Sequence, residues 1–362
     1  MKKLTKILLN LTAVCGLAWA GAQNRDSLDL EFAIGEVEAS YAGFPDKVCD
    51  RTRADYETLK TRLRGDVRQK GRSGYDAVAE YMGWFEDIHL RCASFSDAYR
   101  VKSIPDYGEG FAPQQVACRV DDDTFLIRVP SFEMDDDRIA WVRDAAESYR
   151  RSGCERLIVD LRGNGGGNDR VYQPLLELLY DHEGETDGVE VRVSPGSCAA
   201  IRQIAAQQPG TTWLAALADS LSVARTEFIP LLADEDFAIR FDSVAPLPRR
   251  AGVIIDGCVA SSGEQFVLDV RACSSRTTIY GRDNTLGCLD FSNLRRVDLP
   301  CCKISCMIPM TRSYRVAEGR GIDRDGIAPD VRIPLPLPDS LTDNVDEWVR
   351  WAAERLKTEK QE

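Results

Sequence analysis

Apolar residues between position 25 and about position 95 recur mostly every three or four residues. The first run consists of Leu28, Phe32, Ile34, Val37 and Tyr41, and the second of Tyr56, Leu59, Leu63 and Val67. This spacing places apolar side chains on one face of a helix. Glycine-containing breaks at residues 43–45 and 71–74 separate the helices, and a third helix is predicted near residues 75–85. The pattern predicts a small N-terminal helical domain over residues 23–96.

The pattern changes after residue 97, where strands and helices are predicted to alternate. Apolar strands at residues 124–129 and 157–161 flank an amphipathic helix at residues 135–151. A β-α-β unit of this kind forms a parallel strand pair with a right-handed crossover. Further strands are predicted at residues 252–256, 277–281 and 307–315, and further helices at residues 171–180, 199–227 and 264–272, with a break around residues 209–210. We expect an α/β core over residues 97–340 and an amphipathic C-terminal helix within residues 341–362.

Residues 1–22 have the pattern of a secretory signal peptide. A basic start precedes an apolar stretch, Ile7 to Trp19, that is too short to span a bilayer. Small residues follow at the positions that cleavage after Ala20 or Ala22 requires. The sequence therefore predicts export to the periplasm or secretion. Since no other long apolar run occurs, we expect no membrane span in the mature chain.

The balance of charge is acidic. The chain has 46 Lys and Arg against 58 Asp and Glu, a formal charge of −12, and loss of the three lysines in residues 1–22 takes the charge to −15. An acidic surface repels the phosphates of nucleic acid and of anionic membranes. We therefore expect neither as a partner.

The chain contains twelve cysteines, of which eleven remain after removal of the segment that holds Cys15. An exported protein can form disulfides, and an odd number leaves at least one thiol without an intramolecular partner. No Cys-x-x-Cys spacing occurs and the chain has only two histidines, so no metal site is predicted. Most cysteines, including those of the dense segment Cys301 to Cys306, are interpreted as disulfides or small buried residues.

The predicted strand at residues 157–161 runs into a glycine-rich turn, Arg162-Gly163-Asn164-Gly165-Gly166-Gly167. Glycines allow the backbone to bend sharply and to approach a ligand closely. A backbone N–H at Gly165 or Gly166 could stabilise a developing oxyanion. No Gly-Lys-Ser/Thr follows, which excludes a phosphate-binding P-loop, and Asn168 stands where a dinucleotide fingerprint needs glycine. A plain tight turn is the alternative.

The predicted strand at residues 252–256 leads to Ala260-Ser261-Ser262-Gly263-Glu264. Ser261 and Glu264 have the spacing of a capping box, which by itself explains the motif as a helix start. A serine at a helix N-terminus also lies in positive potential, which suits a nucleophile. Both interpretations are open at this point.

Two further segments complete a set of ordered motifs. Residues 280–287 read Tyr-Gly-Arg-Asp-Asn-Thr-Leu-Gly, and residues 321–331 read Gly-Ile-Asp-Arg-Asp-Gly-Ile-Ala-Pro-Asp-Val. With the two turns above, the set resembles the S41 peptidases, the family of the tail-specific protease and the tricorn core, over roughly residues 120–340. The resemblance implies a ClpP/crotonase-like α/β core, a serine-type peptidase acting on proteins or peptides, and no cofactor. It assigns the nucleophile to Ser261, with Ser262 as the fallback and its N–H as the second oxyanion donor.

The base is assigned by the same resemblance. The tail-specific branch uses a lysine after the Thr-x-Gly segment, but Cys288 stands there and no lysine occurs between residues 250 and 302. The tricorn-like branch uses a histidine from an upstream segment, which matches His89 in Glu86-Asp87-Ile88-His89. A histidine titrates near neutral pH and suits a general base. The other histidine, His182, lies in a charged loop and is predicted to be solvated.

An orienting carboxylate is expected behind the histidine. Asp323 matches the position of the family glutamate best, and Asp87 and Glu318 are alternatives. Ile88 stands where tricorn-like enzymes have a serine, so their tetrad is not intact.

About thirty residues separate His89 from the first core strand, too few for a PDZ domain of on the order of a hundred residues. Tethering of substrate C-termini by such a domain is therefore not expected. A second function class is an inactive peptidase-like module that binds peptides, which the departures at Cys288 and Ile88 motivate. A nucleotide-binding α/β enzyme is a third. The sequence does not predict the oligomeric state.

Overall fold

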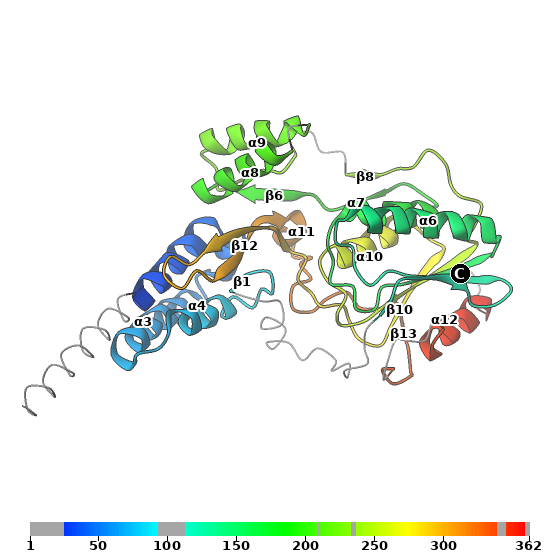
Figure 1. Ribbon diagram of the computed structural model, residues 1–362, viewed down its shortest axis with the longest axis horizontal. Helices are drawn as coiled ribbons and strands as arrows, with labels where there is room; N and C mark the ends of the chain where they lie inside the picture. Colours follow the sequence, from blue (N-terminus) through cyan, green and yellow to red (C-terminus); the bar gives the residue numbers. More distant parts are fainter. Residues whose placement is uncertain (1–24, 93–112, 209, 233–236, 339–344, 359–362) are drawn as a thin grey trace, which may run out of the picture. The chain divides into compact units, whose positions relative to one another are not determined.

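The computed structural model describes residues 25–92, 113–208, 210–232, 237–338 and 345–358 (Figure 1). The chain divides into two compact units. The N-terminal unit consists of residues 1–102, 189–233 and 291–312, and the core unit consists of residues 103–188, 234–290 and 313–362. The predicted signal peptide lies outside the described residues.

The N-terminal unit begins with helices, as predicted. Residues 25–40 are helical, followed by α2 (Phe44–Lys47), α3 (Arg53–Lys70) and α4 (Gly74–Gly83). Gly71 ends α3 in the left-handed conformation (φ 67°), which glycine adopts readily. The Ser73 side chain then caps α4 by accepting a hydrogen bond from the Asp76 N–H. Local capping chemistry therefore sets the break that the sequence predicted between these helices.

The N-terminal unit also contains a five-stranded sheet that we did not expect there. Its strands are β1 (Arg91–Cys92), β6 (Val189–Arg192), β7 (Phe228–Pro230), β11 (Phe291–Asp298) and β12 (Ser305–Ser313). The order is β1-β12-β6-β7, and β11 also pairs with β12. The N-terminal unit thus includes strands that lie far beyond residue 96 in the sequence. Helices α8 (Pro195–Gln207) and α9 (Thr212–Val223) pack on β6 through a shared apolar cluster.

The core unit is built on a six-stranded sheet in the order β13-β10-β9-β4-β3-β2. The strands are β2 (Val116–Arg119), β3 (Thr124–Arg128), β4 (Arg156–Asp160), β9 (Arg250–Ile255), β10 (Thr277–Gly281) and β13 (Val331–Arg332). Every pair from β3 to β13 is parallel, and β2 is antiparallel to β3. The carboxyl ends of the parallel strands therefore lie at one edge, which is where polar turns in such sheets gather.

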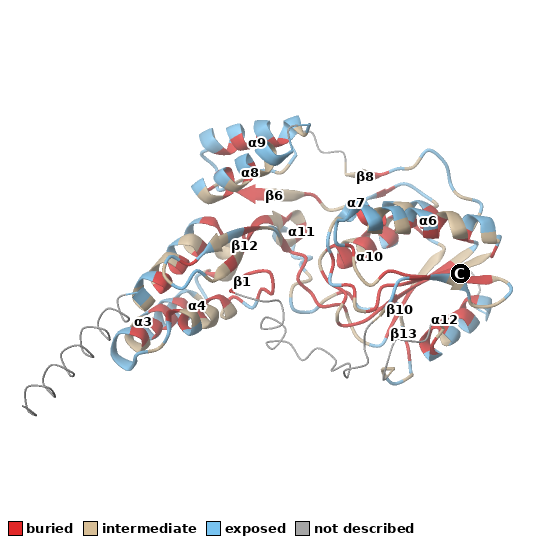
Figure 2. Ribbon diagram, viewed as in Figure 1, coloured by how far each residue is buried: buried red, intermediate tan, exposed pale blue. Residues whose placement is uncertain are grey.

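Both faces of the core sheet are covered, because alternate side chains of each strand point to opposite faces. Helices α6 (Asp136–Ser152), α7 (Asp169–Leu179) and α10 (Ser262–Cys273) pack on the face that presents Leu157 and Val159. Helix α12 (Glu347–Thr358) packs on the other face, against Leu126, Ile158 and Ile254. Figure 1 shows α6 and α12 on opposite sides of the sheet, and Figure 2 shows the strands between them as buried.

The structure confirms the predicted α/β class and the parallel β3-α6-β4 unit. The predicted helix over residues 199–227 is the pair α8 and α9, and the predicted strand at residues 307–315 is β12. The core unit is completed by the short ribbon of β5 (Gly184–Glu185) and β8 (Ala238–Ile239) and by α11 (Tyr314–Ala317). Within the described ranges, no helix is both long enough and apolar enough to cross a bilayer.

Candidate active site

Ser261 lies in the turn between β9 and α10 in a strained backbone conformation. Its φ of 53° and ψ of −121° lie outside the regions that a non-glycine residue normally occupies. The residue is the N-cap of α10, and its N–H donates to Glu264 Oε2 at 3.3 Å. The predicted capping box is thus present, but it does not require a positive φ. Such strain concentrates at functional sites, where surrounding contacts hold it in place.

The glycine-rich turn packs directly against Ser261. Gly166 has a φ of +97°, and a Cβ atom placed on it would lie 2.7 Å from Ser261 Cβ and 2.7 Å from the Ala260 carbonyl oxygen. The same atom would lie 3.0 Å from Ser262 N. Only glycine fits this position. The structure therefore brings together Gly166, Ser261 and Ser262, which the sequence placed in two separate motifs.

The backbone N–H groups of the turn differ in what they contact. The Gly166 N–H donates to Asn164 Oδ1 at 2.9 Å, so this donor is already occupied. Gly165 is exposed, and no acceptor for its N–H is found in the described part of the chain. The Ser262 N–H belongs to the first turn of α10, where N–H groups have no partner within the helix. Of the two predicted glycine donors, Gly165 is the one available to a substrate.

Asp169, which the sequence analysis missed, contacts Ser262. It is the first residue of α7, directly after the Asn168 N-cap, and it shares a side-chain hydrogen bond with Ser262. Although the residue as a whole is exposed, desolvation of its carboxyl group raises the pKa of Asp169 to about 6, against the lowering effect of Ser262. Its place at a helix start right after the glycine turn was the signal that could have identified it.

A cavity of about 280 Å³ lies beside this contact and is lined by Asp169, Tyr172, Gln265 and Asp269, among others. Asp269 accepts hydrogen bonds from Tyr172 Oη at 2.7 Å and from Gln265 Nε2 at 2.7 Å. Burial raises the pKa of Asp269, and these bonds oppose the shift. The cavity wall next to the Ser261 turn is therefore rich in carboxyl groups.

Glu264 joins the serine motif to the segment at residues 280–287. Its buried carboxylate accepts hydrogen bonds from Thr285 Oγ1 at 2.6 Å, Gly287 N at 2.6 Å and Cys288 N at 3.0 Å. The same carboxylate accepts the Ser261 N–H. Glu264 thus links the Ser261 turn to residues 285–288, and we call this contact the junction. Cys288 takes part in the junction through its backbone N–H.

The closing segment at residues 321–331 packs on the same junction. The Ile327 N–H donates to Thr285 Oγ1 at 2.7 Å. Asp290 Oδ2 accepts from the N–H groups of Ile322 at 2.7 Å and Asp323 at 2.8 Å, and the Asp290 N–H donates to Asp323 Oδ1 at 3.2 Å. All four predicted motifs therefore converge in the core unit. Asp323 is placed in this junction.

His89 lies in the N-terminal unit, between α4 and β1, and is buried. Its Nδ1 is 2.6 Å from the carbonyl oxygen of Phe291, the first residue of β11. A carbonyl oxygen can only accept, so Nδ1 carries the hydrogen and Nε2 is the basic nitrogen of the neutral ring. Asp87 holds the His89 backbone, since its Oδ1 accepts the His89 N–H at 2.8 Å. Since His89 and Ser261 belong to different units, their pairing stays a prediction, as does the role of Asp323.

The second histidine is placed as predicted. His182 is exposed and pairs with the neighbouring Asp181 at 2.5 Å. Among the residues with described positions, no three His, Cys, Asp or Glu side chains are arranged to hold a metal ion.

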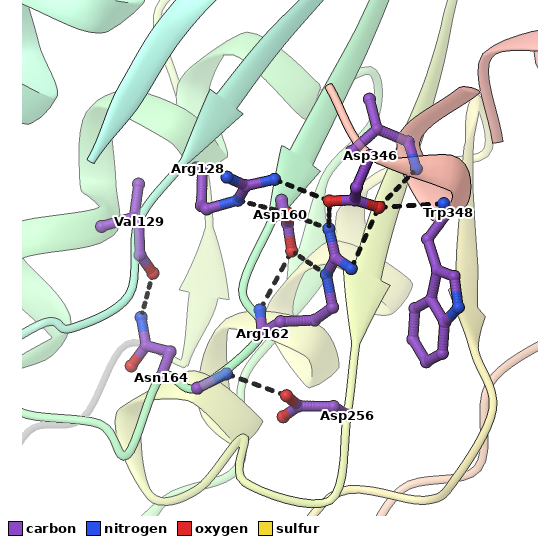
Figure 3. A network of polar contacts seen from close by, with 10 residues as sticks. Arg128, Val129, Asp160, Arg162, Asn164, Asp256, Asp346 and Trp348 are labelled. Carbon is purple, nitrogen blue, oxygen red and sulfur yellow. Dashed lines mark hydrogen bonds and ion pairs between the residues drawn. The ribbon is translucent and has the colours of Figure 1, made fainter. Parts of the chain in front are cut away.

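A buried ion network stabilises the start of the glycine turn (Figure 3). Arg162 donates to Asp160 Oδ2 at 2.7 Å and to Asp346 Oδ2 at 2.6 Å, and Arg128 donates to the same two carboxylates at 2.7 and 3.0 Å. Desolvation acts to raise the pKa of Asp160, but the two guanidinium groups outweigh it and lower the pKa to about 2. The Asp-Leu-Arg part of the motif therefore links the turn to α12, whose N-cap is Asp346.

A glycine turn pressed against a strained serine at a helix start, on a parallel α/β sheet, is the arrangement of a serine hydrolase site. The model of peptidase family S41 matches residues 123–333, more than half of the chain. The chain belongs to peptidase family S41, so it is a serine-type peptidase whose substrates are proteins or peptides.

Solved structures show the same fold over almost the whole chain. A candidate peptidase from Parabacteroides merdae ATCC 43184 is 15% identical with a TM-score of 0.59, covering 92% of this chain and 96% of that one. Mature CPAF is 12% identical with a TM-score of 0.62, covering 93% and 96%. A lipoprotein from Streptococcus agalactiae is 14% identical with a TM-score of 0.51, covering 92% and 96%. A search of curated protein sequences found no match.

Proposed function

We propose that the protein is an exported serine endopeptidase in which Ser261 is the nucleophile and His89 is the general base. The observation that carries the proposal is the strained Ser261 turn, which Gly166 contacts on one side and Glu264 fixes on the other. A helix start alone needs neither the positive φ nor the close glycine. A nucleophile that must project toward a bound carbonyl needs both.

In the proposed mechanism, Ser261 Oγ attacks the scissile carbonyl carbon while His89 Nε2 takes the hydroxyl proton. The N–H groups of Gly165 and Ser262 stabilise the oxyanion of the tetrahedral intermediate. The intermediate breaks down when His89 returns the proton to the leaving amine, which leaves an acyl-Ser261 ester. Water, deprotonated by His89, then hydrolyses the ester and regenerates the serine.

The orientation of His89 in this proposal comes from the Phe291 carbonyl, which fixes Nδ1 as the protonated nitrogen. The Phe291 carbonyl takes the place of the orienting carboxylate that the resemblance assigns to Asp323, so in this proposal Asp323 acts on the imidazolium through its charge alone. Cys288 supports a histidine rather than a lysine mechanism, because the residue at the family lysine position has no amine to act as base.

Export is proposed from residues 1–22 alone, whose basic start, short apolar stretch and small-residue cleavage sites suit a signal peptide. We expect the mature chain to begin at Gly21 or Gln23 and to be found in the periplasm or the medium. N-terminal sequencing of the protein from these fractions tests the point. A chain that keeps Met1 in the cytoplasm would contradict it.

The catalytic proposal is tested by cleavage of a diverse peptide mixture, read by mass spectrometry, together with labelling by a fluorophosphonate probe. The wild type is expected to cut internal peptide bonds and to take the label on Ser261. Ser261→Ala is expected to lose both, and His89→Ala to lose both to a large degree. Ser262→Ala serves as the matched control because it removes the neighbouring hydroxyl, and it should keep the label.

Each departure from these results has a definite meaning. A label on Ser262 would move the nucleophile to the fallback residue. Cuts that survive in His89→Ala but not in Ser261→Ala would refute His89 as the base. Peptide binding without cuts or label in the wild type would favour the inactive binding module.

A further inference from the structure

Two cysteines of the N-terminal unit lie directly opposite each other on neighbouring strands. Strand β1 pairs antiparallel with β12, with Arg91 opposite Met307 and Cys92 opposite Cys306. Opposed residues of an antiparallel pair have Cα atoms about 4.5 or 5.5 Å apart. Both values fall within the roughly 4.4–6.8 Å that a disulfide spans. Their side chains also point to the same face, because opposed residues share the phase of the pleat.

The two thiols are in contact and sealed from solvent. Each side chain shares a hydrogen bond with the other, and Cys92 and Cys306 are 5% and 0% exposed. The hydrogen bond from Cys306 lowers the pKa of Cys92, and the same contact raises the pKa of Cys306. A thiol with more thiolate character reacts faster in thiol–disulfide exchange.

We propose that Cys92 and Cys306 form a disulfide in the exported protein, and that this bond holds the segment that carries His89. The reaction breaks two S–H bonds and forms one S–S bond. The two electrons and two protons pass to a disulfide oxidant of the exchange type, such as oxidised glutathione, which is reduced to two thiols.

The bond would act close to the proposed base. His89 lies two residues before the start of β1, and its ring is hydrogen-bonded to the Phe291 carbonyl on β11. Strand β11 pairs with β12 from Phe291 opposite Arg312 onward, so β12 lies between the strand that holds the acceptor of the ring and the strand that holds Cys92. Strand β1 has only two residues. A covalent link therefore secures a pairing that few backbone hydrogen bonds hold.

Neighbouring cysteines give the alternatives. Cys301 and Cys302 lie in the turn before β12, where their N–H groups donate to Asp29 at 2.7 and 3.0 Å. Cys302 is exposed as a residue, but desolvation of its thiol raises the pKa of Cys302, and the contact with the Asp29 carboxylate adds to this rise by disfavouring the thiolate. Register and burial therefore favour Cys306 as the partner of Cys92.

Peptide mapping tests the bond without reference to activity. The mature protein is exposed to oxidised glutathione, its free thiols are blocked with N-ethylmaleimide, and it is digested with trypsin without reduction. Cys92 then lies in the peptide 92–100, Cys306 in the peptide 304–312, and Cys301 with Cys302 in the peptide 297–303. We expect peptides 92–100 and 304–312 to be joined and to separate on reduction. Peptide 152–156 is the control, because Cys154 is buried in the core unit and should carry the blocking group once the protein is denatured.

Blocked thiols on both peptides, or a link from peptide 92–100 to peptide 297–303, would overturn the proposal. The effect on turnover rests on the proposed role of His89 and is measured separately. Reductant should lower peptide cleavage by the wild type and by Cys154→Ala, but should cause no further change in Cys306→Ala. A joined pair with cleavage that reductant leaves unchanged would refute the link to His89 while the disulfide stands.

Discussion

The ion network beneath the glycine turn predicts that Asp346→Ala strongly destabilises the core unit. Asp346 accepts hydrogen bonds from Arg128 and Arg162, and its Oδ1 also caps α12 by accepting the Trp348 N–H at 2.9 Å. Truncation would leave two buried guanidinium groups sharing one carboxylate. Removing one partner of a buried ion pair costs about 3–5 kcal/mol, and losing an N-cap costs about 1 kcal/mol. We expect a loss of roughly 4–6 kcal/mol in the free energy of unfolding.

Urea unfolding followed by circular dichroism measures this loss. Asp346→Asn separates the two contributions, since asparagine caps a helix as well as aspartate does but carries no charge. The matched control is Lys357→Ala, at the other end of α12, where Lys357 pairs with Asp121 at the surface at 2.9 Å. A surface pair of this kind contributes about 0–1 kcal/mol. If Asp346→Ala lost no more stability than Lys357→Ala, the network would not be what holds α12 on the sheet.

Three further outcomes follow from the geometry. Gly166→Ala should lower kcat/KM for peptide cleavage about tenfold to a hundredfold, because the new Cβ would meet Ser261 and the Ala260 carbonyl at a φ that costs about 1–3 kcal/mol. Gly65→Ala is the control, since no atom lies near the Cβ there, and equal rates in the two variants would contradict the packing. The lowered pKa of Asp160 means that its stabilisation is present above about pH 4 and is lost as the pH falls toward 2, so acid unfolding of Asp160→Asn should depend less on pH in that range than unfolding of the wild type. The raised pKa of Asp169 affects stability in the opposite direction, so stability should fall as the pH rises from about 4 through 6. Asp169→Asn should remove this fall, and melting temperatures of both proteins at pH 4.5 and 7.5 test it.

The core of the fold was predictable because its signals are local. Strands β3, β4 and β9 are apolar runs bounded by turns, and the capping box of α10 is visible in the sequence. The short strands β6 and β7 could not be predicted in the same way. These strands are only four and three residues long, which is too short for an alternating pattern to stand out, and their partners lie elsewhere in the chain. The predicted boundary at residue 96 also differs from the observed division. Residues 189–233 and 291–312 belong to the N-terminal unit because their strands pair with β12 or with each other.

The part of the candidate site that short sequence motifs form could be predicted from the sequence. The turns that hold Gly166 and Ser261 were found separately, and the structure explains their joint occurrence by direct contact. The function of Glu264 as an anchor for Thr285 and Gly287 could not be read from spacing, because the capping box alone accounts for a glutamate there. Asp169 was missed because an acidic residue at a helix start has an ordinary explanation in the helix dipole.

Strand β12 has a consequence for the order in which the chain can fold. It pairs with β1, β6 and β11, yet it lies more than 200 residues after β1. At the usual 5–20 residues per second of synthesis, β1 emerges roughly 10–40 s before the strand it pairs with. During that interval β3 and β4 of the core and the pair β6 and β7 are synthesised, but the strand that joins β1 to β6 is still missing. Assembly of the N-terminal unit is therefore a late event, and a chain arrested before residue 305 would present His89 without the strand that fixes its surroundings.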